Sequence, residues 1–444
     1  MVLFSLLSLW LYFLSLSAGS RLSLWLLRSG AVMALLLAMQ TKEISITVPA
    51  LAVLLDWLVF GTRLRQAAMR AAPLLICLPL IPALVFYTAA VQHGEFGLNT
   101  ALNIVNSREV PVSHWHYVVT ELTVLVHYLR QLIWPTGLNI DPEWPMYRAF
   151  WNWQVLGAFS ILVGVIVCAV WVFRRFRHDM RLALGFVGVL WFFLTVSISS
   201  GLVPLPDLVA EHRTYMPSVG VFLLAACLLD WLRCSKLSLR PGVVAPAVAL
   251  VCTAALSWAT YARNEVWSSR ERLWEDTVAK SPNKFRTWGN LGAAYSDGGK
   301  EEQAVQCYRK ALELEPHFQN GMLNLSNSLL RLNRPQESLD TTLDLIRLDE
   351  NAGRRAPVVF TLGLGLAGVG RYDDAVSVFR ELLAATPDDP MVHKALGLVY
   401  FQTGLPHRAL DHYHQADKLQ PGDIQLKHMI LAAEQKLADR LARR

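Results

Sequence analysis

The segment FRTWGNLGAAYSDGGKEEQAVQCYRKALELEPHF, residues 285–318, decides the architecture of the C-terminal part of the chain. Counted from Phe285, the small residues Gly292 and Ala304 fall at positions 8 and 20, where they let two antiparallel helices approach closely. Pro316 at position 32 predicts the end of the second helix. Large residues fill the seam between the helices at positions 4, 7, 11 and 24: Trp288, Leu291, Tyr295 and Tyr308.

The same register returns downstream. We expect four units of one helix pair each, at 285–318, 319–352, 356–389 and 390–423, with a short insertion before the third. A lead-in helix at 263–284 and an amphipathic capping helix at 424–444 complete the array. A 34-residue period with this spacing is the tetratricopeptide repeat (TPR) pattern, so the sequence predicts an α-α superhelix.

The chain changes character upstream of residue 263. Hydrophobic residues make up 53% of the whole sequence, more than a water-soluble protein requires. Apolar runs close to the ~20 residues of a bilayer core follow one another, so a multi-pass membrane domain is predicted for 1–262. The fold class is therefore all-α, with a polytopic membrane domain before the TPR array. About eight spans are expected, at 1–18, 22–39, 42–60, 73–91, 153–173, 182–203, 215–232 and 243–261.

The charge distribution bears on topology and partners. The net charge of +6 lies entirely in residues 1–262, because basic and acidic residues are equal in number over 263–444. A neutral repeat region argues against nucleic-acid binding. Three short basic loops, at 63–70, 174–181 and 233–240, predict the cytoplasmic side of the bilayer. The six cysteines show neither a disulfide framework nor metal-ligand spacing.

Residues 114–134 decide the remaining topology. Polar and apolar side chains occupy opposite faces of the predicted helix, which is typical of a helix that lies in the interface or lines a wet cavity. We therefore expect it not to span, so that the outer loop 92–152 stays on one side. The N-terminus and the TPR array then share the outer face, so the repeats are expected to be periplasmic or lumenal. The compact loops and the outer-face placement favour a bacterial inner membrane, with periplasmic repeats, over an endoplasmic reticulum.

Charged residues at the outer ends of the spans are candidates for chemistry. Lys42 can hold a phosphate, and Glu43 can position or deprotonate a hydroxyl. Arg213 is a bidentate phosphate partner in a short loop with Glu211 and His212. Arg108 lies in the long outer loop. Snorkelling end charges and a loop ion pair are the structural alternatives. His114 and His116, two residues apart, share a helix face poorly, so no metal site is expected.

Several motifs follow one another in a distinctive order. They are AMQTKEISITVP (38–49), SREVP (107–111), HYLRQLIWP (127–135), LNID (138–141), EHRTYMPSVG (211–220) and RNEVW (263–267). Together they resemble the transmembrane-and-TPR O-mannosyltransferase family and its bacterial relatives. The resemblance implies a glycosyltransferase C (GT-C) membrane fold. It also implies transfer of a sugar from a polyprenyl-phosphate carrier, the donor substrate, to a protein hydroxyl outside the cytoplasm; no further cofactor is implied.

One departure from the family pattern concerns catalysis. GT-C enzymes carry an acidic motif in the first outer loop, and no acidic residue precedes Glu43 here. The resemblance implies that the N-terminal segment is missing, that the start is misassigned, or that catalysis has been lost. In the enzyme hypothesis Lys42 and Arg213 neutralise the departing phosphate, while Glu43 and Glu211 are weak candidates for the acid–base group. The alternative is a non-catalytic, membrane-anchored TPR scaffold.

Asparagines on the predicted inner helices indicate how an acceptor polypeptide is held. Asn290 and Asn324 both fall at position 6, and Asn327 lies nearby at position 9. An Asn side chain can pair with both the C=O and the N–H of an extended peptide. The pattern ends after the second repeat, since position 6 is Thr361 and then Ala395. Ordinary exposed asparagines are the alternative, and the sugar, carrier, acceptor and oligomeric state stay open.

Overall fold

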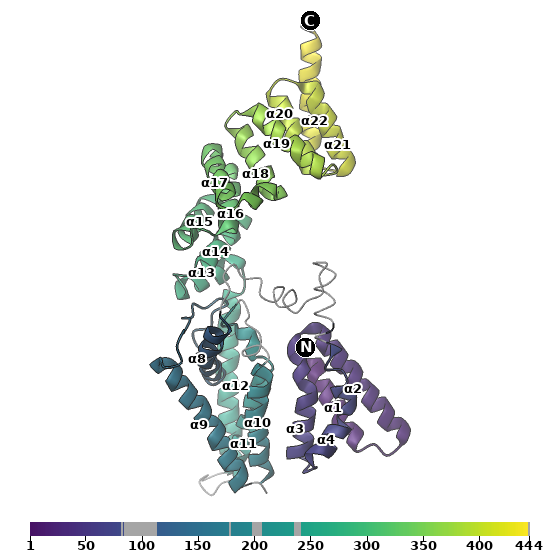
Figure 1. Cartoon of the computed structure of the whole chain (residues 1–444), viewed down its shortest axis with the longest axis vertical. Coiled ribbons are helices and arrows are strands. Elements are labelled where there is room, and N and C mark those ends of the chain that lie inside the picture. The colour runs from purple at the N-terminus through teal and green to yellow at the C-terminus, as the bar shows by residue number, and fades with distance from the viewer. Residues whose placement is uncertain (81–82, 84–112, 177–178, 198–206, 235–240, 443–444) are drawn as a thin grey trace. The chain divides into compact units, whose positions relative to one another are not determined.

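The computed structural model describes residues 1–80, 83, 113–176, 179–197, 207–234 and 241–442. Within these ranges every regular element is a helix, which confirms the predicted all-α fold class. The chain forms two compact units, Met1–Asn264 and Glu265–Arg444 (Figure 1).

The first unit begins with helices α1 (Val2–Leu16) and α2 (Arg21–Thr41), which pack against each other. A capping box of Ser20 and Ser23 starts α2. The apolar run after Lys42 is divided into a 3₁₀ turn, η1 (Glu43–Thr47), and α3 (Val48–Leu58), where Pro49 occupies the first turn. Two short helices follow, α4 (Leu64–Arg70) and α5 (Ala72–Leu75).

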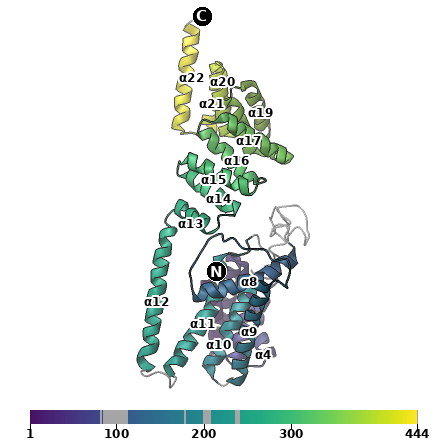
Figure 2. The ribbon, with the colours of Figure 1, turned by 90° about the vertical axis from the view of Figure 1, so that its left-hand side faces the viewer.

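The second part of this unit contains α8 (His114–Ile133), α9 (Trp153–Arg175), α10 (Met180–Ser197), η3 (Glu211–Thr214), α11 (Pro217–Cys234) and α12 (Pro241–Val266). Helices α10 and α11 lie side by side in both views (Figures 1 and 2). Gly188 and Gly220 meet where they cross, and a Cβ on Gly188 would lie 2.5 Å from the carbonyl oxygen of Gly220. Small residues of this kind let membrane helices approach closely.

Four described helices are long and apolar enough to cross a membrane: α2, α9, α10 and Val243–Val266 of α12. The apolar helices Val2–Leu16, Ile44–Leu58 and Pro217–Trp231 are shorter. The fourth expected span, 73–91, lies mostly outside the described residues. The total of eight spans therefore stays a prediction.

The second unit is a succession of helix pairs (Figure 2). After α13 (Arg270–Lys280) come α14 (Phe285–Asp297), α15 (Glu301–Leu314), α16 (Gln319–Arg331), α17 (Pro335–Leu348), η4 (Glu350–Arg354), α18 (Ala356–Gly368), α19 (Tyr372–Ala385), α20 (Pro390–Gln402), α21 (Pro406–Leu419) and α22 (Ile424–Ala442). The turn inside each pair needs a left-handed residue at position 15. Glycine supplies it with φ between 74° and 84° at Gly299, Gly370 and Gly404, and Asn333, with φ 56°, does so in the second pair.

Packing within each pair follows from the small residue at position 8. A Cβ on Gly292 would lie 2.7 Å from the ring of Tyr308, the aromatic residue at position 24. The second pair instead has Ser326 at position 8 and Thr342 at position 24, both buried. A larger residue at position 8 is thus matched by a smaller, non-aromatic residue at position 24, which explains why this repeat is degenerate in sequence and regular in structure.

Candidate functional site

The structure joins two of the predicted charged stretches through one apolar core. Ile44, next to Glu43, lies in the same buried cluster as Trp191 of α10 and Met216, which follows the Glu211–Tyr215 stretch. The Trp191 indole Nε1 donates a hydrogen bond to the Met216 carbonyl oxygen at 2.8 Å. Segments far apart in sequence are therefore held at one place in the first unit.

Arg213 is buried, with 5% of its surface exposed. Its Nη1 donates to the carbonyl oxygen of Leu208 at 3.2 Å and its Nη2 to that of Asp207 at 2.7 Å. Both nitrogens thus hold the backbone of the loop that precedes η3. A guanidinium suits this task because it presents several donors in a fixed plane.

Glu211 fastens the same loop to α8 and to the segment after it. Its Oε1 accepts hydrogen bonds from the backbone N–H of Asn139 at 2.5 Å and from Gln131 Nε2 at 3.3 Å. The buried Tyr128 hydroxyl accepts a hydrogen bond from the backbone N–H of Ala210, with 2.9 Å between nitrogen and oxygen. Burial raises the pKa of Tyr128, so its phenol stays neutral. The Glu211–Thr214 turn is consequently fixed from two sides.

The polar face of α8 is covered by the chain that follows the helix. The Thr120 hydroxyl accepts the backbone N–H of Tyr147 at 2.9 Å. Trp144 Nε1 donates to the Thr123 hydroxyl at 3.0 Å, and its ring lies 4.7 Å from that of His127. The amphipathic pattern thus has a partner within the protein, namely the segment between Ile133 and Trp153.

The other predicted site residues are placed as follows. Lys42 is half-buried and ends α2 in an extended conformation. Glu43 begins η1, and its side chain lies outside the described residues, as does Arg108. His212 is exposed beside Arg213. Sequence reasoning assigned no role to Trp191 or to Tyr128, although Tyr128 lies within a motif that carried the family resemblance.

The predicted asparagines occupy successive inner helices of the repeats. Asn290 lies on α14 and Asn324 on α16, and both are partly exposed. Asn327 is engaged differently, because its Oδ1 accepts a hydrogen bond from the buried Thr361 hydroxyl of α18 at 3.0 Å. Asn290 and Asn324 are therefore the better placed pair for a ligand, while Asn327 links two repeats.

Comparison with protein families confirms TPR repeats in the C-terminal region. Tetratricopeptide repeat models match residues 285–318, the first predicted unit, and residues 360–424. Among curated proteins, the chain is 25% identical to mouse (Mus musculus) Protein O-mannosyl-transferase TMTC1 over 253 residues, 54% of this chain and 26% of that protein. The chain is thus similar to these transferases over about half of its own length. Human (Homo sapiens) TMTC3 is 23% identical over 50% of this chain and 25% of its own length.

The match spans about a quarter of the length of these relatives. Solved TPR structures are also similar: YrrB is 21% identical over 37% of this chain and 81% of that chain, with a TM-score of 0.31. TTC0263 of Thermus thermophilus is 23% identical over 40% and 95%, with a TM-score of 0.32. The four apolar helices and the matched repeats together describe a membrane protein with a C-terminal TPR array.

Proposed function

We propose that this protein transfers a sugar from a polyprenyl-phosphate carrier to hydroxyl groups of proteins on the extracytoplasmic side of a membrane. The observation that carries the proposal is its homology to protein O-mannosyl-transferases in a chain that combines apolar helices with TPR repeats. Such a reaction needs a cation at the departing phosphate and a device that presents the acceptor.

Lys42 is the residue to which we assign the phosphate. It ends the apolar helix α2, and the segment that follows it shares a core with Trp191 and Met216. His212 is exposed in the neighbouring loop and is the second candidate. Arg213 contributes by fixing that loop, because both of its terminal nitrogens already hold backbone carbonyls. Glu211 likewise anchors the loop through Asn139, which leaves Glu43 as the remaining acid–base candidate within this chain.

The repeats supply the proposed acceptor site. Asn290 and Asn324 lie at the same position of consecutive inner helices and are partly exposed, so an extended backbone can pair with both. Asn327 can add only its amide nitrogen to this pair of asparagines, because its Oδ1 accepts a hydrogen bond from Thr361.

A transfer assay tests the proposal. Membranes containing the full chain receive polyprenyl-phosphate mannose with a labelled sugar and an acceptor polypeptide rich in Ser and Thr. We expect label in the polypeptide with the wild type and about ten- to a hundredfold less with Lys42→Ala, from loss of one charged hydrogen bond. The matched control is Arg63→Ala, which removes an exposed cation at the start of α4 and should leave transfer unchanged. Equal transfer in all three proteins would refute the assignment of Lys42.

The second candidate function is a membrane-anchored TPR scaffold without catalysis. The hydrogen bonds of Arg213 and Glu211 within the protein favour the scaffold, because these bonds explain the positions of both side chains without a substrate. Absence of transfer, together with acceptor binding that Asn290→Ala/Asn324→Ala abolishes and Asn327→Ala does not, would select the scaffold.

The proposed side of the membrane has its own test. With the three basic loops cytoplasmic, the repeats of an inner-membrane protein would be periplasmic. An alkaline phosphatase fused after Arg444 should then be active. An inactive phosphatase fusion, together with activity of a cytoplasmic reporter fused at the same position, would overturn both this topology and an extracytoplasmic Lys42.

A further inference from the structure

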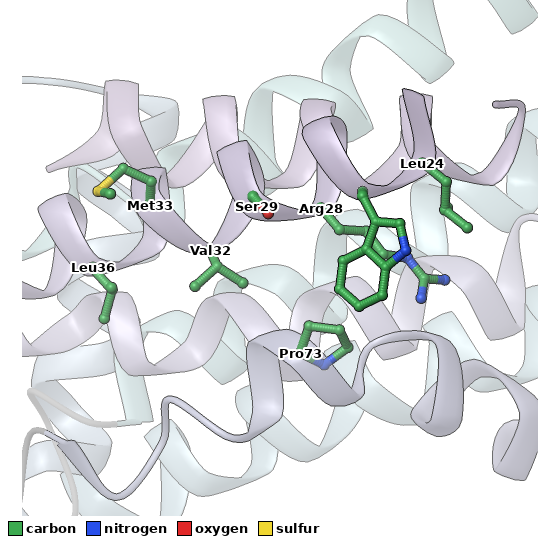
Figure 3. Close-up of a pocket in the computed structure, with 8 residues that line it drawn as sticks. Leu24, Arg28, Ser29, Val32, Met33, Leu36 and Pro73 are labelled. Carbon is green, nitrogen blue, oxygen red and sulfur yellow. The ribbon is translucent and has the colours of Figure 1, made fainter. Parts of the chain in front are cut away.

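The membrane unit contains a groove that the proposed transfer reaction does not use. Its volume is about 370 Å³, and it lies between α2 and Pro73 of α5 (Figure 3). Residues of α2 form the remaining wall: Leu24, Trp25, Arg28, Ser29, Val32, Met33 and Leu36. The lining is apolar except for Arg28 and Ser29, and the Arg28 side chain extends toward the Leu24 end of the groove (Figure 3).

Among the described residues, no carboxylate forms a salt bridge with Arg28. Asp56, the buried carboxylate of this helix bundle, pairs with Arg70 at 3.3 Å and also accepts hydrogen bonds from Tyr12 and Thr62. The Arg28 Nε is buried and has no hydrogen-bond partner among the residues that the structure describes. A buried donor of a charged group is costly unless an acceptor meets it. The groove therefore presents a cation that an anion would satisfy.

The position of Arg28 along α2 suits a contact with a lipid headgroup. Arg28 lies about 10 Å inside the start of α2 at the 1.5 Å rise of a helix, so its long side chain, directed toward the Leu24 end, brings the guanidinium close to the headgroups. Trp25, one turn before Arg28, is 70% exposed, as is typical of aromatic residues at headgroup level. Val32, Met33 and Leu36 continue the groove as an apolar path from Arg28.

We infer that this groove binds one anionic phospholipid. Its phosphate accepts hydrogen bonds from the Arg28 guanidinium, and one acyl chain lies along Val32, Met33 and Leu36. A guanidinium is suited to this contact because it pairs with two phosphate oxygens at once. The site is separate from Lys42, which ends the same helix about 20 Å further along at the rise of 1.5 Å per residue. It does not depend on the proposed transfer reaction.

Native mass spectrometry of the full chain tests the inference. The protein is reconstituted with equal amounts of phosphatidylglycerol and phosphatidylcholine, and lipid retained after detergent extraction is measured. We expect preferential retention of one phosphatidylglycerol by the wild type and about a tenfold weaker preference in Arg28→Gln. Arg21→Gln, which removes an exposed cation at the start of the same helix, should retain the wild-type preference.

Two further variants separate binding from folding. Arg28→Lys keeps the charge and should recover part of the preference. Met33→Trp alters an exposed groove residue without touching the charge, and should reduce retention while the melting temperature stays unchanged. Equal retention of the two lipids by the wild type, or equal preference in Arg28→Gln and wild type, would show that Arg28 only extends toward the bilayer surface. Preference for polyprenyl phosphate over phosphatidylglycerol would also overturn the assignment.

Discussion

The Trp191 indole donates its hydrogen bond to the Met216 carbonyl oxygen inside a core that also contains Ile44. A helix of the second half of the membrane unit thereby fixes the end of the Glu211–Tyr215 stretch next to the segment that follows Lys42. This bond positions two candidate site segments without itself contacting a substrate.

Trp191→Phe tests the importance of that bond. The substitution keeps an aromatic ring but removes the shorter of two hydrogen bonds to the buried Met216 carbonyl, which retains the one from the Val219 N–H at 3.4 Å. The loss of one hydrogen bond should lower the free energy of unfolding by about 0.5–1.5 kcal/mol. Thermal unfolding in detergent measures the change. Trp171→Phe, on the exposed face of α9, is the control and should have little effect. Equal stability of both variants would mean that the hydrogen bond from the Val219 N–H is sufficient for the Met216 carbonyl.

Lys42→Ala and Arg213→Ala should have different effects, the first on transfer activity and the second on stability. Lys42→Ala is expected to lower transfer while leaving unfolding unchanged. Arg213→Ala frees two backbone carbonyls and should destabilise the protein by about 1.5–3 kcal/mol, with any loss of transfer following from the disordered loop. Paired stability and transfer measurements decide this. A fully stable Arg213→Ala protein with reduced transfer would instead place Arg213 on the substrate phosphate.

Gly220→Val should disrupt the pairing of α10 and α11. Gly220 faces the Gly188 backbone so closely that a side chain forces the helices apart, and overpacking of this kind costs about 1–3 kcal/mol. Gly164→Val on α9 is the matched control, because no heavy atom lies within 4 Å of the added Cβ. Comparable thermal unfolding of the two variants would contradict the close approach.

The fourth repeat should lose stability as the pH falls. His393 and His412 meet through their Nδ1 atoms at 3.0 Å, so at least one ring must be neutral to accept the hydrogen bond. Burial, followed by the proximity of His393 and Arg380, lowers the pKa of His412 below 6.5, although Asp411 opposes the shift. The unfolded chain then binds the proton more readily, and stability is lost as the pH falls from about 6.5 through the lowered pKa.

Hydrogen exchange of α20 and α21 measures this effect. In the wild type, exchange should be faster at about pH 5.5 than at about pH 7.5, after correction for the intrinsic rate. In His412→Gln the difference should largely disappear, while α14 and α15 serve as an internal reference in both proteins. A difference that persists in His412→Gln would assign the pH dependence to other groups.

The repeats could be predicted from sequence because their determinants are local. Gly292 and Tyr308 belong to one helix pair, and their spacing is fixed by the repeat itself. Even the degenerate second repeat keeps a residue able to adopt a left-handed conformation at position 15, namely Asn333.

The membrane site could be predicted only in part. Lys42 and Glu211 were recognisable as charges at the ends of apolar runs. Trp191 was not, because an aromatic residue in an apolar helix carries no sign of the partner it will meet. Arg28 was recognisable as a charge near a helix end. The groove that it lines could not be predicted, because Pro73 on the opposite wall is brought close to α2 only by the tertiary fold.

The shared core of Ile44, Trp191 and Met216 also has a consequence for biosynthesis. Ile44 leaves the ribosome long before Met216, so the first helices must enter the membrane with part of their packing surface unmatched. Contacts of such high sequence separation form late and slowly. Quality-control proteases would therefore find these early helices vulnerable until α11 is synthesised, and a ribosome stalled before Met216 would yield a product prone to degradation.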